Sequence, residues 1–209
     1  LNPEYANNFE INFISRKKSI EFNGSIYYTN LNNAIIRSNG TFNGIDSIMY
    51  DGSLSKVQTL KNSGKAYVFG FSYMINYKIN NNLNLKSSVS FNQSKDLSTK
   101  LPLRHSSPIF GQTSINFTKR NIKVSYYINY NGKKDISNFS PSELNKLYLY
   151  TKDGSPAWLT NNISFIYNIN YLAKINFSCE NVFDIHYRSY SSGISAPGRN
   201  FNIGLNMSF

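Results

Sequence analysis

Apolar and polar residues alternate along most of the chain, and this period of two constrains the fold more than any other feature. Segment 65-79 is the clearest case: from Tyr67 to Ile79 every odd position is aromatic or aliphatic, whereas the even positions from Ala66 to Lys78 are mainly small or polar. Successive side chains of a β-strand point to opposite faces. The segment is therefore predicted to be a strand with one face suited to hydrocarbon and the other suited to water.

The same alternation predicts nine strands, all antiparallel, and an all-β fold. They cover 7-15, 19-30, 65-79, 82-93, 109-118, 121-132, 157-169, 172-182 and 199-209. Most are about ten residues or longer, which is enough for a tilted strand to cross the apolar part of a bilayer. The longest apolar runs have four residues, as in 66-69, so a spanning helix is not predicted. The pattern instead indicates a transmembrane β-barrel.

The connections between these strands sort by length. Those at 15-18, 80-82, 118-121 and 170-171 are short, whereas those at 31-64, 94-108, 133-156 and 183-198 are long. Outer-membrane barrels have short periplasmic turns and longer external loops. The alternation therefore predicts four external loops and a C-terminus in the periplasm.

Composition and motifs exclude several function classes. The net charge of +11 comes from dispersed Lys and Arg residues, so nucleic-acid binding is not predicted. Cys179 is the only cysteine and occupies an apolar strand position, where a structural role is expected. His105 and His186 lack nearby partners for a metal site. No catalytic motif is present, so we expect no enzyme, cofactor or metal centre.

Several stretches resemble the barrel of TonB-dependent outer-membrane receptors. LNPEYANNFEI at 1-11, VQTLKNSGKAYVFGFSYMINYKINNNLNLKSSVSFNQS at 57-94 and PLRHSSPIFGQTSINF at 102-117 are similar to strand-entry patterns of that family. DGSPAWLTNNISFIYNI at 153-169 and ENVFDIHYRSYSSGISAPGRNFNIGLNMSF at 180-209 match its closing blocks best. Ser72 departs from the family, which often has Glu there. The family closes with 22 strands, so residues 1-209 are expected to be the last nine, without the plug domain.

The resemblance implies a receptor of the Gram-negative outer membrane that imports a scarce ligand such as a siderophore, cobalamin or an oligosaccharide. Its expected partners are the rest of the barrel, the plug, the TonB complex acting through the plug, lipid and lipopolysaccharide. The alternating last segment, which ends on an aromatic residue, resembles the signal read by the barrel-assembly machinery. That signal would consist of Phe201, Ile203, Leu205, Met207 and Phe209.

Candidate ligand-binding residues lie in the long loops and at the rim, where Arg and Tyr could bind an anion. They are Arg37, Tyr50, Lys56, Arg104, His105, Trp158, Tyr187, Arg188, Tyr190 and Arg199. In the block 180-198, a structural interpretation competes with ligand binding: Asn181 and Asp184 would shape a turn, while Tyr187, Arg188 and Tyr190 would cover the rim.

Two other interpretations stay open at this point. The chain could belong to a plugless barrel that acts as a pore or as a component of a secretion or assembly complex. It could also be a soluble all-β adhesin or binding domain, which only the mean hydropathy of −0.40 favours. If the chain spans a bilayer, segments 7-15 and 199-209 must pair with strands outside it, because unpaired backbone groups are too costly in hydrocarbon.

Overall fold

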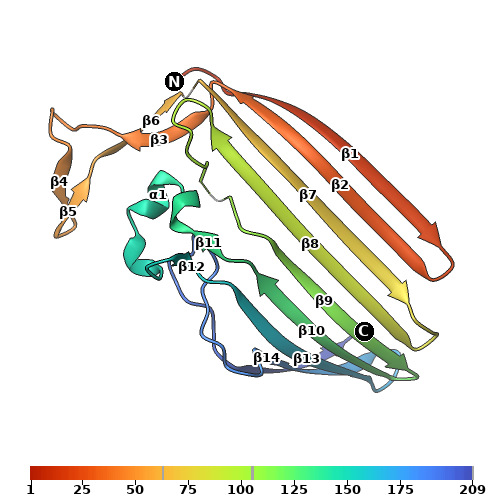
Figure 1. Ribbon diagram of the computed structural model, residues 1–209. Helices are drawn as coiled ribbons and strands as arrows, with labels where there is room; N and C mark the ends of the chain where they lie inside the picture. Colours follow the sequence, from red (N-terminus) through yellow and green to blue (C-terminus); the bar gives the residue numbers. More distant parts are fainter. Residues whose placement is uncertain (63, 105, 209) are drawn as a thin grey trace.

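The computed structural model describes residues 1–62, 64–104 and 106–208, and its main feature is one large antiparallel sheet (Figure 1). Nine strands follow one another in chain order across this sheet. They are β1 (Tyr5–Lys17), β2 (Ile20–Asn32), β7 (Lys65–Lys78), β8 (Leu83–Asp96), β9 (Phe110–Lys119), β10 (Ile122–Asn131), β13 (Trp158–Asn168), β14 (Ala173–Glu180) and β15 (Asn200–Met207). The nine predicted strands are confirmed, with ends displaced by at most a few residues.

The strand register places the apolar residues in continuous rows on one face of the sheet. Ile11 pairs with Ile26, Ile26 with Phe71, and Phe71 with Phe91. On β13 to β15, Ile163 pairs with Cys179 and Cys179 with Phe201. Because one row runs from strand to strand without changing face, the sheet carries a broad apolar belt, and Cys179 lies within it as the sequence predicted.

This apolar belt is uncovered by the described residues. Ile11 is 76% exposed and Ile203 is 81% exposed. Among described residues the buried apolar side chains are few: Ala34, Ala66, Val89, Phe139 and Tyr190. A water-soluble sandwich would bury one face of each sheet against the other. The described residues do not pack in this way, and an uncovered apolar belt is the arrangement expected of a sheet that faces lipid.

The opposite face of the sheet is polar, and its side chains bond to one another across strands. Ser25 donates to Glu10 at 2.7 Å, and Thr29 donates to Asn8 at 2.7 Å. Further along the sheet, Ser125 donates to Asn116 at 2.8 Å. Such cross-strand pairs support the register, and they leave this face suited to water or to a polar filling.

Short turns join the strands at one end of the sheet. The side chain of Asn80 accepts hydrogen bonds from the backbone N–H groups of Asn82 and Leu83, both at 2.9 Å. Asn170 accepts equivalent bonds from Leu172 and Ala173, both at 2.8 Å. In these Asx turns the bonds that close the turn come from residues within it. The end of β15 lies at this end of the sheet, and β1 starts at the other (Figure 1).

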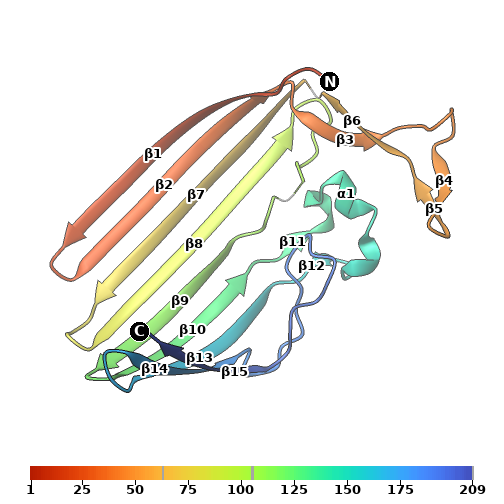
Figure 2. The same ribbon diagram turned by 180° about the vertical axis from the view of Figure 1, so that it is seen from behind.

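The four long connections lie at the opposite end, and they contain regular structure that alternation did not predict. The first forms an arm that extends away from the sheet (Figure 2). Its base is the ribbon of β3 (Ile35–Asn39) and β6 (Gln58–Asn62), and its tip is the hairpin of β4 (Ser47–Tyr50) and β5 (Ser53–Lys56). The third connection holds β11 (Lys134–Asp135), η1 (Ile136–Asn138), α1 (Pro141–Leu144), η2 (Leu147–Leu149) and β12 (Gly154–Ser155).

Local turn chemistry explains the shape of the arm. The hairpin turn consists of Asp51 and Gly52, both with positive φ (46° and 74°), and a second turn uses Asn43 and Gly44 (50° and 81°). Asp-Gly and Asn-Gly are the preferred pairs for tight hairpin turns with two left-handed residues. The turn signals are present in the sequence, but the strands they join have only four or five residues, too few for alternation to separate them from a loop.

None of the helices in the described residues is both long enough and apolar enough to cross a membrane.

Candidate ligand-binding end of the sheet

Three of the four long connections fold together around an aromatic cluster. The rings of Phe139 and Tyr150 are 4.7 Å apart between centroids, those of Phe139 and Tyr190 are 5.3 Å apart, and those of Tyr150 and Tyr190 are 6.1 Å apart. Phe139 is 1% exposed. Because Tyr190 comes from a different connection than the other two, the cluster joins 132–157 to 181–199. We call these three residues and the groups bonded to them the loop core.

Glu143 on α1 supplies the polar part of the loop core. It is buried, and its carboxylate accepts hydrogen bonds from the Tyr150 hydroxyl and, at 2.7 Å, from Ser191. Burial raises the pKa of this carboxyl, but these hydrogen bonds and the nearby Lys146 and Arg104 outweigh burial, so the net pKa is lowered. Burial and the bond to Glu143 raise the pKa of Tyr150. Glu143 is therefore a charged acceptor that ties two loops together.

Lys134 joins the second long connection to the loop core. Its ammonium group donates to the backbone carbonyl of Ser106 and lies 4.5 Å from the centroid of the Tyr190 ring. Burial lowers the pKa of Lys134 to about 8. A cation over an aromatic face is favourable, so Lys134 contributes to the packing of three connections at one point.

Arg188 and Arg199 are engaged in holding loop backbone. Arg188 donates to the carbonyl of Leu149 at 3.0 Å and to the Ser195 hydroxyl at 3.2 Å. The side chain of Arg199 donates to the carbonyl of Val182 at 2.8 Å. The structural role that competed with ligand binding is therefore present for both residues, and their action on a ligand stays a prediction.

Asn181 and Asp184 shape the last connection as turn residues. Asn181 has a φ of 50°, and its side chain both donates to and accepts from the backbone of Ile185, at 2.9 and 3.0 Å. The backbone N–H of Asn181 donates to Asn162 on β13 at 2.9 Å. Asp184 accepts from the backbone N–H of Arg199 at 2.8 Å. These bonds turn the connection back over the polar face of the sheet.

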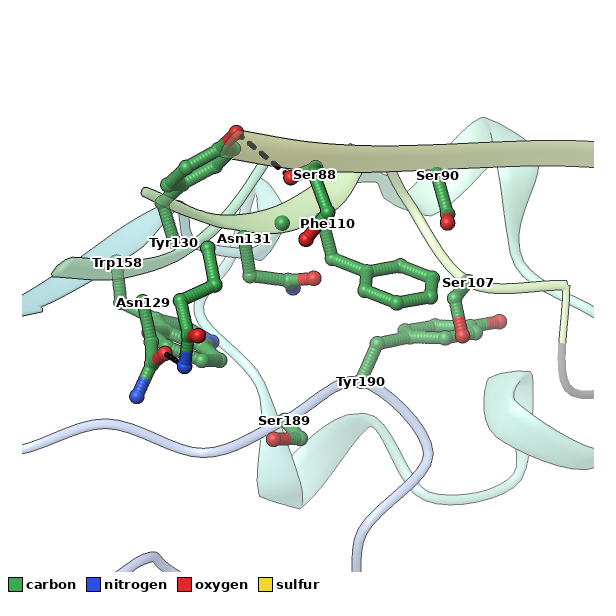
Figure 3. A pocket seen from close by; sticks show the side chains of 12 residues that line it. Ser88, Ser90, Ser107, Phe110, Asn129, Tyr130, Asn131, Trp158, Ser189 and Tyr190 are labelled. Atoms are coloured by element: carbon green, nitrogen blue, oxygen red, sulfur yellow. Dashed lines mark hydrogen bonds between the residues drawn. The ribbon is translucent and has the colours of Figure 1, made fainter. Parts of the chain in front are cut away.

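A pocket of about 520 Å³ lies between this folded connection, the middle of β8 and the ends of β9, β10 and β13 (Figure 3). We call it the polar-face pocket. It is lined by Ser88, Ser90, Ser107, Phe110, Gly111, Gln112, Asn129, Tyr130, Asn131, Trp158, Ser189 and Tyr190. Phe110 and Trp158 both pair with Asn131, which brings three strand ends to one place.

Tyr130 differs from the other lining residues because it crosses above the strands. Its hydroxyl donates to the carbonyl of Ser88 at 3.2 Å, as the dashed line in Figure 3 shows. The path runs over Gly111, where an added Cβ would collide with the Tyr130 hydroxyl. A glycine is required at this position because the backbone carbonyl of Ser88 and the phenol ring of Tyr130 occupy the space of a side chain.

A second hollow of about 550 Å³, the arm groove, separates the arm from the connection 97–109 and from α1. Its basic residues are Arg37, Lys61 and Arg104. Glu4 and Asp96 also line it, and Glu4 accepts a hydrogen bond from the backbone N–H of Ile35 at 2.7 Å. The groove thus combines three cations with apolar side chains such as those of Leu60 and Leu101.

The structure distributes the predicted ligand-binding residues over several places. Arg37 and Arg104 meet in the arm groove, and Trp158 and Tyr190 meet in the polar-face pocket. The ring of Tyr187 lies 4.3 Å from that of Trp158. Tyr50 and Lys56 lie apart from both hollows, on the hairpin at the tip of the arm. His105 lies outside the described residues.

The predicted insertion signal occupies one face of β15. Phe201, Ile203, Leu205 and Met207 are all exposed there, in line with the apolar belt. Phe209 lies outside the described residues.

Sequence reasoning missed Lys134, Glu143, Gln112 and Asn129. Glu143 stands at the third position of a one-turn helix that begins with Pro141, but nothing in the sequence indicates its burial. Gln112 and Asn129 lie on polar strand positions like many others, and only the register brings them together, with Gln112 donating to Asn129 at 2.8 Å. The described part of the chain contains no group of three or more His, Cys, Asp or Glu side chains that could hold a metal ion.

No protein-family model matches this sequence, and no curated protein matches it. Solved structures do match. The copper transporter OprC superposes with a TM-score of 0.79 at 13% identity, over 100% of this chain and 32% of OprC. The FrpB iron transporter from Neisseria meningitidis (F3-3 variant) gives 0.71 at 18% identity, over 99% of this chain and 30% of FrpB.

The ferric yersiniabactin uptake receptor FyuA from Yersinia pestis gives a TM-score of 0.67 at 15% identity, over 99% of this chain and 30% of FyuA. The chain therefore spans about a third of the length of the solved structures it matches. The matched proteins are TonB-dependent outer-membrane receptors. The described residues thus have the antiparallel fold of a portion of the β-barrel of TonB-dependent outer-membrane receptors.

Proposed function

We propose that this chain forms part of the barrel of an outer-membrane receptor that imports a scarce ligand with energy delivered through TonB. The observation that carries the proposal is the nine-stranded sheet with one exposed apolar face, a polar opposite face and all long connections at one end. Lipid on one side and an aqueous or plugged lumen on the other account for both faces. The superposition on barrels of that receptor family supports the same conclusion.

The long connections are proposed to face the outside of the cell, and the short turns and the end of β15 the periplasm. In bacterial barrels the long loops are external. The apolar face of β15 would then be presented to the barrel-assembly machinery during insertion. Lipid would cover the apolar belt. The basic residues at the long-loop end of the sheet would meet the phosphates of lipopolysaccharide.

The remaining partners follow from the family. The two unpaired edges of the sheet would continue into the rest of the barrel, a plug would fill the lumen beside the polar face, and TonB would act on that plug. The cargo of the matched proteins is named as copper, iron and ferric yersiniabactin. For this chain we propose ligand capture at the long-loop end, in the polar-face pocket and the arm groove.

In the arm groove, Arg37 and Arg104 are proposed as ligand contacts, with Lys61 beside them. In the polar-face pocket the proposed contacts are Trp158 and Tyr190. Tyr187 would act by backing the Trp158 ring. Tyr50 and Lys56 on the arm tip could reach a ligand only if the arm moved, and Arg188 and Arg199 only if they gave up their present loop bonds.

The test is uptake by cells that carry the intact receptor. We expect the protein in the outer-membrane fraction, ligand binding at the cell surface without energy, and accumulation only with both TonB and an inner-membrane proton gradient. Accumulation that continues without TonB would contradict the proposal and would indicate a pore. Recovery of the protein in the soluble fraction without detergent would contradict the membrane assignment itself.

A further inference from the structure

We propose that the polar-face pocket binds a neutral, hydroxyl-rich ligand of the carbohydrate class; the inference rests on the proposed function, which places this pocket on the aqueous side of the barrel wall. The pocket is lined by amides, hydroxyls and aromatic rings. The amides are those of Gln112, Asn129 and Asn131, and the rings facing the hollow are those of Phe110, Trp158 and Tyr190 (Figure 3). Serine hydroxyls from β8 and from two connections complete it.

The described lining of the polar-face pocket carries no charged side chain, although charged residues are present elsewhere in the chain. The chain contains 22 Lys and Arg residues against 11 Asp and Glu, yet none of them lines the described pocket. The charged groups nearest in the loop core are engaged elsewhere: Lys134 bonds the Ser106 carbonyl, and Glu143 bonds Tyr150 and Ser191. An ionised ligand would lose hydration here without gaining a counter-charge. The pocket therefore disfavours anionic chelates.

The polar side chains that line the pocket can pair with the hydroxyl groups of a sugar. Amides and hydroxyls each donate and accept hydrogen bonds, as sugar hydroxyls do. Among the described residues, the buried indole N–H of Trp158 has no acceptor. A buried donor without a partner costs free energy, because it has lost its bond to water and gained none in return. The N–H is closed to solvent as placed, so a turn of the indole ring toward the pocket is needed before a ligand hydroxyl can accept this bond and remove that cost.

The aromatic residues offer flat apolar surfaces beside those polar groups. Trp158 enters from the start of β13 and is backed by Tyr187, whereas Tyr190 enters from the last connection and is packed on Phe139. The C–H face of a sugar ring can bury its apolar area against such rings. A volume of about 520 Å³ lies within the usual range for small-molecule sites.

The pocket is held in shape before a ligand arrives. The Gln112–Asn129 bond fixes two amides, and the loop core holds Tyr190. Fixed side chains lose little freedom on binding, which favours affinity.

The test uses the intact receptor, purified in detergent, and isothermal titration calorimetry. The neutral probes are the hexasaccharides of maltose, cellulose, mannan and chitin; the charged probes are hexagalacturonate and a ferric tricatecholate. We expect at least one neutral probe to bind. Trp158→Ala should weaken it by roughly tenfold or more, and Trp158→Phe, which keeps a ring and removes the N–H, by about fivefold.

Tyr148→Ala is the matched control, because this aromatic residue of the same loop end is 82% exposed and lines neither hollow. It should bind the neutral probe as the unmodified receptor does. Heat-modifiable migration on a gel would verify that each variant has folded. Trp158→Phe keeps the test valid if the alanine variant does not fold.

The inference is overturned if no neutral probe binds, or if binding is unchanged in Trp158→Phe and Trp158→Ala. A receptor that binds the ferric tricatecholate but none of the neutral probes, and accumulates it with TonB, would contradict the inference and leave the proposed function intact. Conversely, Trp158-dependent sugar binding without TonB-dependent accumulation would retain the pocket assignment and contradict the proposed transport.

Discussion

Cys179 reports the environment of the apolar belt, because it is the only cysteine of the chain and lies between Ile163 and Phe201. In membranes we expect it to react with an uncharged, lipid-soluble maleimide and not with a charged, water-soluble one. The control carries Cys179→Ser with Ser178→Cys, which moves the thiol to the polar face. Mass spectrometry after labelling measures both. Efficient labelling of Cys179 by the charged reagent would contradict a lipid-facing belt.

Glu143 is predicted to make the loop core sensitive to acid. Its pKa in the folded loops is lowered from the reference value of 4.5, so its contribution to stability is complete above that value. That contribution is lost as the pH falls through the folded pKa. Spin labels at the exposed residues Tyr148 and Ile194 would report this loosening as a broader distance distribution.

Substitutions at Glu143 should separate charge from packing. Glu143→Gln should remove the acid response, and Glu143→Ala should broaden the distances at neutral pH, because the Tyr150 and Ser191 hydroxyls lose their acceptor at about 1–3 kcal/mol each. Asp153→Asn, an exposed site of the same connection, is the control. An acid response that persists in Glu143→Gln would show that another group controls the loops.

At the scale of a strand, two neighbouring residues of β7 test which face meets lipid. Phe71 lies in the row Ile11–Ile26–Phe71–Phe91, while Ser72 pairs with Ser25 and Ser90 on the polar face. Phe71→Arg should destabilise the folded barrel by about 2–4 kcal/mol, the range for Arg near the bilayer midplane, whereas Ser72→Arg should be tolerated far better. Urea unfolding in lipid vesicles measures both. Equal effects would refute the assignment of faces.

Alternation, sheet membership and turn position could be predicted for every strand of the large sheet, because each depends on residues close in sequence. The arm was missed, although Asn43-Gly44 and Asp51-Gly52 carry clear turn signals. Its strands are four or five residues long, and their pattern is too short to separate from a loop. Residues 133-156 likewise read as a loop, since α1 has one turn and its stability comes from the loop core.

At the scale of the whole molecule, the backbone groups along the outer edges of β1 and β15 lack hydrogen-bond partners within the described sheet. Within the described sheet, β1 and β15 each have a neighbour on one side only. An open edge in hydrocarbon leaves backbone groups unsatisfied at several kcal/mol each. We therefore predict that, in the intact receptor, both strands pair with further strands.

Hydrogen exchange on the intact receptor tests this pairing. If both edges are paired, the amides of β1 and β15 should exchange as slowly as those of the central strand β7. The exposed ribbon of β3 and β6 supplies the fast-exchanging control. Alternate fast amides along β1 would show an open edge and contradict closure into a larger barrel.

The sequence by itself determined the architecture of the sheet: which residues form the apolar belt, where the short turns lie, and which end carries the long connections. A period of two is a local property: successive side chains of a strand point to opposite faces, so the contrast between an apolar and a polar environment is written directly into neighbouring residues. Only the tertiary structure decided the chemistry at the loop end. Whether Arg188 faces a ligand or a carbonyl, and whether Trp158 meets charges or amides, depends on contacts between connections far apart in the chain, for which no local pattern exists.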